Sequence, residues 1–125
     1  MGRGARAQTR QAEHGCGYLS DWGQAAAARF LREEGVEISV ADDLCDAENA
    51  DKWEIQLDAR YDEAAGGPTI DYGRMEALIG RLRTTPGLVV CEDGVDRGEA
   101  LADVLEDGVE ASKKHGYDWI VIDWW

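Results

Sequence analysis

The sequence has few lysines, few prolines and a small, odd number of cysteines. It contains three lysines, two prolines and three cysteines, which are Cys16, Cys45 and Cys91. Three widely spaced cysteines do not fit the disulfide framework that stabilises many small secreted domains. A reducing compartment is the simplest setting for unpaired thiols, so we expect the protein to be cytoplasmic.

The sequence also lacks the apolar segments that export and membrane insertion require. Residues 1–15 contain Arg3, Arg6 and Arg10 but no apolar stretch of the kind found in signal peptides. Nowhere does the chain approach the roughly 18 consecutive apolar residues of a membrane-spanning helix. We therefore expect no export signal and no membrane span.

Positive charge is scarce in this chain. Lysine and arginine together number 13 against 26 acidic residues, which gives a formal net charge of -13. Phosphate backbones and anionic membranes attract basic clusters and repel such a surface, so we expect no direct contact with nucleic acid or membrane. The simplest alternative is a halophilic globular domain, in which the acidic residues serve solubility alone.

The composition predicts one folded domain preceded by an arm. Hydrophobic residues make up 44% of the chain and charged residues 31%, which is enough apolar material for a core. A length of 125 residues is usual for one domain. Residues 1–17 are rich in glycine and polar residues and lack apolar periodicity. We expect a mobile N-terminal arm over 1–17 and a single acidic α+β domain over 18–125.

Three segments have the apolar periodicity of helices. Each begins at an aspartate that can cap its first turn, namely Asp21, Asp71 or Asp96, and each is followed by glycine or proline. For the third helix, Glu99 stands where a capping box would place it. The apolar stripes comprise Trp22, Ala26 and Phe30; Met75, Leu78, Ile79 and Leu82; and Leu101, Val104, Leu105 and Val109.

Four segments have the patterns of strands. Residues 36–41 and 53–61 alternate between apolar and polar residues, which predicts two half-buried strands. Residues 88–91 form a short apolar run, which predicts a strand over 88–92, and 117–124 are apolar on both faces; both patterns favour interior positions. We expect a roughly four-stranded mixed or antiparallel sheet with three helices largely on one face.

No established catalytic or metal-binding motif occurs in the sequence. It lacks a P-loop, a nucleotide-binding glycine pattern, a serine elbow and a zinc-protease helix. The cysteines and histidines lack zinc-site spacing, and the acidic segment 42–51 lacks EF-hand spacing. We predict no cofactor, no metal and no catalytic residue. A small hydrolase or nuclease with an unrecognised carboxylate site stays an alternative, because carboxylates are abundant here.

Two segments combine the features of a contact surface for a basic protein. Segment 42–51 concentrates acidic residues, and segment 118–125 combines two aspartates with three tryptophans. Acidic charge speeds encounter with a basic partner, and tryptophan is a frequent anchor at interfaces. The expected contact residues are Asp42, Asp43, Asp46, Glu48, Asp51, Asp118, Trp119, Asp123, Trp124 and Trp125.

These observations together predict a non-catalytic acidic protein-binding module. An inhibitor that presents carboxylates where a nucleic-acid-binding protein expects phosphates has this composition. Such an inhibitor is either a DNA mimic of the anti-defence type or the immunity protein of a toxin. A structural subunit of a virion or another assembly is a further alternative, since composition does not separate the two. The sequence leaves the oligomeric state open.

Overall fold

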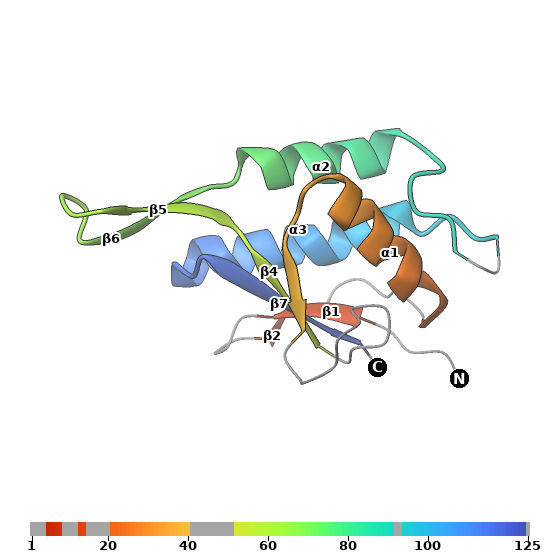
Figure 1. Ribbon diagram of the computed structural model, residues 1–125, viewed down its shortest axis with the longest axis horizontal. Helices are drawn as coiled ribbons and strands as arrows, with labels where there is room; N and C mark the ends of the chain where they lie inside the picture. The colour runs from red at the N-terminus through yellow and green to blue at the C-terminus, as the bar shows by residue number, and fades with distance from the viewer. Residues whose placement is uncertain (1–4, 9–12, 15–20, 41–51, 92–93, 125) are drawn as a thin grey trace.

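The computed structural model describes residues 5–8, 13–14, 21–40, 52–91 and 94–124, with the side chains of 24–39, 53–91 and 94–122. These ranges hold three helices and seven strands in an α+β arrangement, as expected (Figure 1). In chain order they are β1 (Ala5–Gln8), β2 (Glu13–His14), α1 (Asp21–Glu33), β3 (Ile38–Val40), β4 (Lys52–Gln56), β5 (Asp58–Asp62), β6 (Gly67–Asp71), α2 (Gly73–Thr84), α3 (Gly98–His115) and β7 (Trp119–Trp124).

The larger sheet is antiparallel throughout and has the strand order β2-β1-β7-β4-β3. Strand β7 therefore lies in the interior, between β1 and β4, as its apolar character on both faces predicts. Trp53 of β4 stands opposite Ile122 of β7, and Ile55 stands opposite Ile120. Residues paired across neighbouring strands point to the same face of the sheet. All four of these side chains are fully buried.

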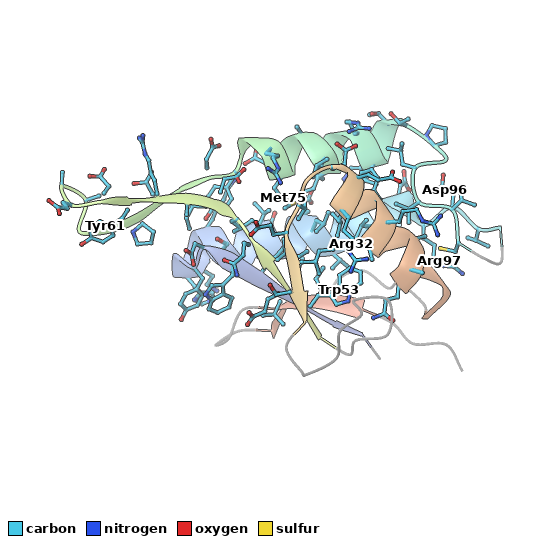
Figure 2. The ribbon with its side chains drawn as sticks, viewed as in Figure 1. Arg32, Trp53, Tyr61, Met75, Asp96 and Arg97 are labelled. Atoms are coloured by element: carbon cyan, nitrogen blue, oxygen red, sulfur yellow. The ribbon has the colours of Figure 1, made fainter. Side chains whose placement is uncertain are left out.

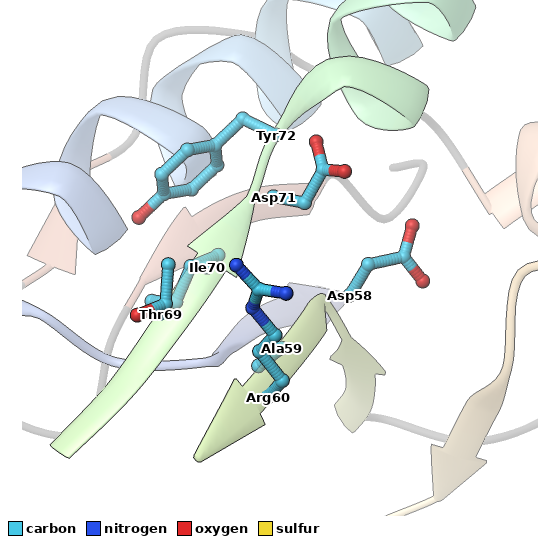
Figure 3. Close-up of a pocket in the computed structure, with 7 residues that line it drawn as sticks. All are labelled: Asp58, Ala59, Arg60, Thr69, Ile70, Asp71 and Tyr72. Atoms are coloured by element: carbon cyan, nitrogen blue, oxygen red, sulfur yellow. The ribbon is translucent and has the colours of Figure 1, made fainter. Parts of the chain in front are cut away.

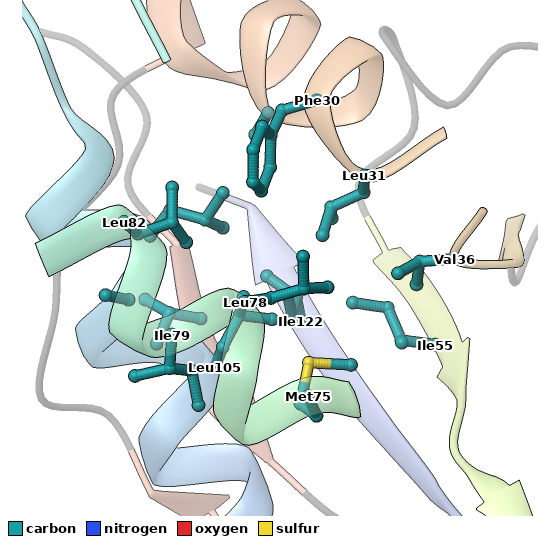
Figure 4. Packing of buried hydrophobic residues seen from close by; sticks show 14 of the residues in the cluster. Phe30, Leu31, Val36, Ile55, Met75, Leu78, Ile79, Leu82, Leu105 and Ile122 are labelled. Carbon is teal, nitrogen blue, oxygen red and sulfur yellow. The ribbon is translucent and has the colours of Figure 1, made fainter. Parts of the chain in front are cut away.

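Apolar residues from all three helices join those of β4 and β7 in one buried cluster (Figure 4). Phe30 and Leu31 come from α1, and the predicted stripes of α2 and α3 are buried as expected. In α3, Leu101, Val104 and Leu105 have no exposed surface. The 3.6-residue period therefore identified the packed faces of α2 and α3 correctly.

The ends of the helices follow from local signals in the chain. Gly35 has a φ of 78°, and the N–H of Val36 donates to the carbonyl of Leu31 at 2.9 Å, which is the Schellman arrangement that ends α1. Gly116, with a φ of 76°, ends α3 in the same left-handed conformation. The sequence predicts both helix ends, because glycine adopts this left-handed conformation without the strain that a side chain would add.

The two later helices begin with the same Asp-x-Gly arrangement. Oδ1 of Asp71 accepts a hydrogen bond from the N–H of Gly73, and Oδ1 of Asp96 accepts one from Gly98, both at 2.9 Å. The predicted capping box with Glu99 is wrong, because Arg97 rather than Asp96 is the N-cap residue. An aspartate whose carboxylate accepts a hydrogen bond from the N–H two residues later forms a turn just before the helix. This bond still gives a partner to one of the N–H groups that the first turn of a helix leaves without one.

The predicted strand over 53–61 is broken at Leu57. Strand β4 belongs to the larger sheet, whereas β5 leaves it and pairs with β6 as a separate two-stranded hairpin. Leu57 is buried, and its N–H donates to the carbonyl of Asp118 at 2.8 Å. The alternation of apolar and polar residues continues through both strands, so the pattern contains no sign of the change in partner.

The predicted strand over 88–92 is wrong for the residues that the structure describes. Residues 88–91 belong to none of the strands, and Val90 makes only an isolated bridge with Asp96. The N–H of Cys91 donates to the carbonyl of Val95 at 3.0 Å, and Val89 is fully buried. A short apolar run therefore marks burial here, and such a run does not by itself distinguish a strand from another buried segment. The expected four-stranded sheet is thus only partly matched.

Strands β1 and β2 lie within residues 1–17, where the sequence predicts a mobile arm. Strand β1 pairs with β7, with Ala7 opposite Ile122, and β2 pairs with β1. Strand β1 thereby provides the second neighbour of β7, a role that its composition did not indicate. The rest of 1–17 lies outside the described residues, and mobility of the arm stays a prediction.

Candidate functional site

The hairpin formed by β5 and β6 extends well beyond the helices and the larger sheet (Figure 1). Its cross-strand pairs run from Asp58 opposite Asp71 to Asp62 opposite Gly67, and Gly66 in the connecting turn has a φ of 75°. Most of its residues are exposed, and Tyr61 retains 73% of its surface. The hairpin therefore leaves most of its side chains free for contact.

The two faces of this hairpin differ in chemistry. Residues that are paired across the strands point to the same side, and successive residues point to opposite sides. The apolar hairpin face accordingly consists of Ala59, Tyr61, Pro68 and Ile70, and the charged hairpin face consists of Asp58, Arg60, Asp62, Thr69 and Asp71. Figure 2 shows Tyr61 projecting from the ribbon into open space.

A groove of about 580 Å³ lies at the base of the hairpin (Figure 3). It is lined by Asp58, Ala59, Arg60, Thr69, Ile70, Asp71 and Tyr72. Both carboxylates of the groove have structural partners. Asp71 bonds the N–H of Gly73, and Oδ1 of Asp58 lies 3.8 Å from Nη1 of Arg74. The groove therefore continues the mixed surface of the hairpin, and its carboxylates orient the start of α2.

Tyr72 connects the base of the hairpin to the end of α3. Its hydroxyl lies 2.8 Å from Oγ of the buried Ser112, and Ser112 Oγ donates to the carbonyl of Tyr117. Because a carbonyl only accepts, Tyr72 must be the donor to Ser112. Lys113 also contacts the Tyr72 ring, with Nζ 5.1 Å from the centroid of the ring and 3.0 Å from Oε1 of Glu76. Contacts between Tyr72 and α3 therefore fix the base of the hairpin to the body of the protein.

Two of the predicted contact residues, Asp118 and Trp119, lie close to this base. The ring of Trp119 stacks on Tyr117, with centroids 4.7 Å apart and an angle of 11° between the planes, and Tyr117 stacks in turn on His115. Asp118 and Trp119 are half-buried, and the carbonyl of Asp118 accepts a hydrogen bond from the N–H of Leu57, just before β5. The structure therefore brings the start of β7 and the hairpin together.

The other predicted contact residues have no described side chains. The backbone of β7 places Asp123 opposite Lys52 of β4, and Trp124 opposite Ala5 of β1. The remaining predicted contacts, which are Asp42, Asp43, Asp46, Glu48, Asp51 and Trp125, lie outside the described residues. Their role in binding stays a prediction.

Sequence analysis missed strand β6 and therefore the hairpin itself. From the sequence we predict no strand over 67–71 and place only the cap of the second helix there, at Asp71. The missed signal was the pair Gly66 and Gly67 after an alternating segment, followed by the β-formers Thr69 and Ile70.

No protein-family model matches the chain, and no curated protein or solved structure matches it. Within the described residues, no three His, Cys, Asp or Glu side chains gather as metal ligands. The helices of that same part of the chain are too short or too polar to cross a bilayer. A proposal for function must therefore be based on the chemistry and shape of the described surface.

Proposed function

We propose that this protein is a non-catalytic, acidic binding module that docks on a protein partner with a basic surface. One observation carries the proposal: the hairpin that extends furthest from the body also concentrates negative charge. Residues 58–71 contain four acidic residues and one arginine, which leaves a formal charge of -3. A partner meets these carboxylates first, and opposite charge accelerates such encounters.

The shape of the hairpin supports a cleft as the docking site on the partner. Clefts that bind nucleic acid are lined with Lys and Arg and accept a narrow element with negative charge along it. The hairpin is a narrow ribbon with Asp58, Asp62 and Asp71 on its charged face. In the inhibitor form of the proposal, these carboxylates take the positions of phosphates and exclude the nucleic acid.

The half-buried rings at the start of β7 provide the second part of the surface. The rings of Trp119 and Tyr117 stack on each other, and aromatic side chains that are already packed lose little conformational freedom on binding. In the proposal, acidic segment 42–51 and the hairpin govern the rate of association. The aromatic residues of 117–125 govern the rate of dissociation, because buried anchors act mainly there.

Kinetic measurements with charge-matched variants test the proposal. A partner is captured from the source cells with the whole protein, and its binding is then measured with purified components. The double variant Asp62→Asn with Glu63→Gln should lower the association rate several-fold and flatten its dependence on salt. The control variant, Glu33→Gln with Glu99→Gln, removes the same charge from exposed helix positions and should leave the rate nearly unchanged.

The outcomes separate the alternatives. If both double variants behave like the wild type towards every captured partner, the acidic charge serves solubility and the proposal is wrong. If the purified protein turns over a substrate, and one carboxylate substitution abolishes turnover without unfolding the chain, the protein is an enzyme. The triple variant of Asp42, Asp43 and Asp46 to Asn tests segment 42–51 in the same assay, with slower association expected.

A further inference from the structure

Strand β5 presents an open edge. Among the described strands it pairs only with β6, so its other edge carries backbone N–H and C=O groups without a strand beside them. An open edge of this kind is a template for pairing with another chain. A two-stranded hairpin is also marginally stable by itself, and further strands or a covering layer stabilise it. The hairpin is therefore suited to extension by another strand.

We propose that the strand added to β5 is β5 of a second copy of this chain, antiparallel and centred on Tyr61. The two hairpins then form one four-stranded ribbon with the order β6-β5-β5-β6. This proposal involves the same hairpin as the proposed function but does not rest on it, because it concerns self-association and not the basic partner.

The charge pattern of β5 is self-complementary about Tyr61. In a two-fold pair, if one residue contacts another across the axis, the reverse contact is also made. Antiparallel pairing centred on Tyr61 places Arg60 opposite Asp62 of the second copy, and Asp62 opposite Arg60 of the second copy. Both residues lie on the charged hairpin face, where opposite charges directly across a strand pair are favourable. The two Tyr61 rings meet on the apolar face, where each is otherwise 73% exposed.

Other symmetric registers are less favourable. Pairing centred on Arg60 places the two arginines opposite each other, and sets Asp58 against Asp62 of the second copy. Pairing centred on Ala59 brings Gln56 and Leu57 to the contact, but Gln56 lies within β4 of the larger sheet and Leu57 is buried. Like charges exclude the first register, and the body of the protein obstructs the second.

Charge repulsion between two copies of the chain limits the strength of this association. Two chains of formal charge -13 repel each other, and salt screens this repulsion beyond about 8 Å at physiological ionic strength. Two short strands bury less surface than a standard interface. We therefore expect a dissociation constant between about 10 µM and 1 mM, measured near 0.15 M salt.

Exchange of the paired charges tests the register. Arg60→Asp places two acidic residues opposite each other, and Asp62→Arg places two basic residues opposite each other. Each variant alone should self-associate at least about fivefold more weakly than the wild type in sedimentation equilibrium. An equimolar mixture of the two should recover association as a mixed dimer, because position 60 of one variant then faces position 62 of the other with opposite charge. Glu63→Arg changes the charge by as much as Asp62→Arg but lies outside these pairs, so its self-association should not fall.

The mixture also controls for damage to the hairpin. Oδ1 of Asp62 accepts the N–H of Ala64 at 3.0 Å, so Asp62→Arg loses a bond that supports the turn. Recovery in the mixture cannot occur if the variant hairpin has lost its structure. A wild-type protein that stays monomeric up to about 1 mM overturns the proposal, as does a mixture that fails to recover association while both variants keep the wild-type free energy of unfolding. If only an added basic partner covers the edge of β5, the self-pairing proposal is equally wrong, while the proposed function stands.

Discussion

Gly108 of α3 packs directly against Ile120 of β7. A Cβ atom at position 108 would lie 2.9 Å from Cδ1 of Ile120 and 3.2 Å from its Cβ. Both residues are buried, and Ile120 has no exposed surface. The absent side chain thus lets the longest helix of the described chain approach an interior strand of the sheet.

Gly108→Ala should destabilise the protein by up to about 2 kcal/mol in urea unfolding. Alanine gains roughly 1 kcal/mol over glycine in helix propensity, but the added methyl overpacks the contact with Ile120, which costs about 1–3 kcal/mol. Gly80→Ala is the matched control, because a Cβ atom added to Gly80 in α2 would have no neighbouring heavy atom within 4 Å. This control should stabilise the protein by up to about 1 kcal/mol. Equal gains from both variants would contradict the close contact.

Tyr72→Phe should destabilise the protein by about 0.5–1.5 kcal/mol, because it removes the hydrogen bond donated to Ser112. Ser112→Ala should cost about 1–3 kcal/mol, since it also leaves the carbonyl of Tyr117 without its donor. The two losses should be less than additive in a double-mutant cycle. Tyr61→Phe removes the same hydroxyl from an exposed ring and should change the free energy of unfolding by less than about 0.5 kcal/mol.

The effect of Asp96→Ala should depend on pH. Backbone N–H groups of Gly87, at 2.7 Å, and of Gly98, at 2.9 Å, stabilise the carboxylate and lower the pKa of Asp96. A lowered pKa in the folded state means that the stabilisation is complete above the unfolded-state pKa of about 3.9, and is lost as the pH falls through the lower folded-state value.

Asp96→Ala should therefore destabilise the protein by about 1 kcal/mol at pH 7, a typical cost for losing an aspartate at the start of a helix. The difference from the wild type should shrink as the pH falls below about 4, measured by urea unfolding at each pH. Glu99→Ala, in the first turn of the same helix, serves as the control. A difference that stays constant down to pH 2 would contradict the role of the Asp96 carboxylate.

Chelation of metal ions should leave the stability unchanged, because no motif with adequate ligand spacing occurs in the sequence. We expect equal melting temperatures before and after dialysis against EDTA. A fall of more than about 5 °C would correspond to roughly 1 kcal/mol or more and would show that a bound metal supports the fold.

Helix ends and helix stripes could be predicted from the sequence because their causes are local. Gly35 and Gly116 end helices through their own backbone conformation, and Asp71 and Asp96 act on amides two residues away. The apolar stripe of α3 repeats within each turn and needs no information from distant residues. The α+β class and the interior position of β7 follow from patterns of the same short range.

Only the tertiary structure decided which strands pair and where the candidate surface lies. The alternation through 53–61 is uniform, yet Ile55 is buried in the sheet and Tyr61 projects into solvent. The difference arises because β4 has β3 and β7 as neighbours, whereas β5 has left the sheet for β6. The alternation of apolar and polar residues indicates only that one face of a strand differs from the other. It does not say whether another layer covers that face, because burial depends on contacts between residues far apart in the chain.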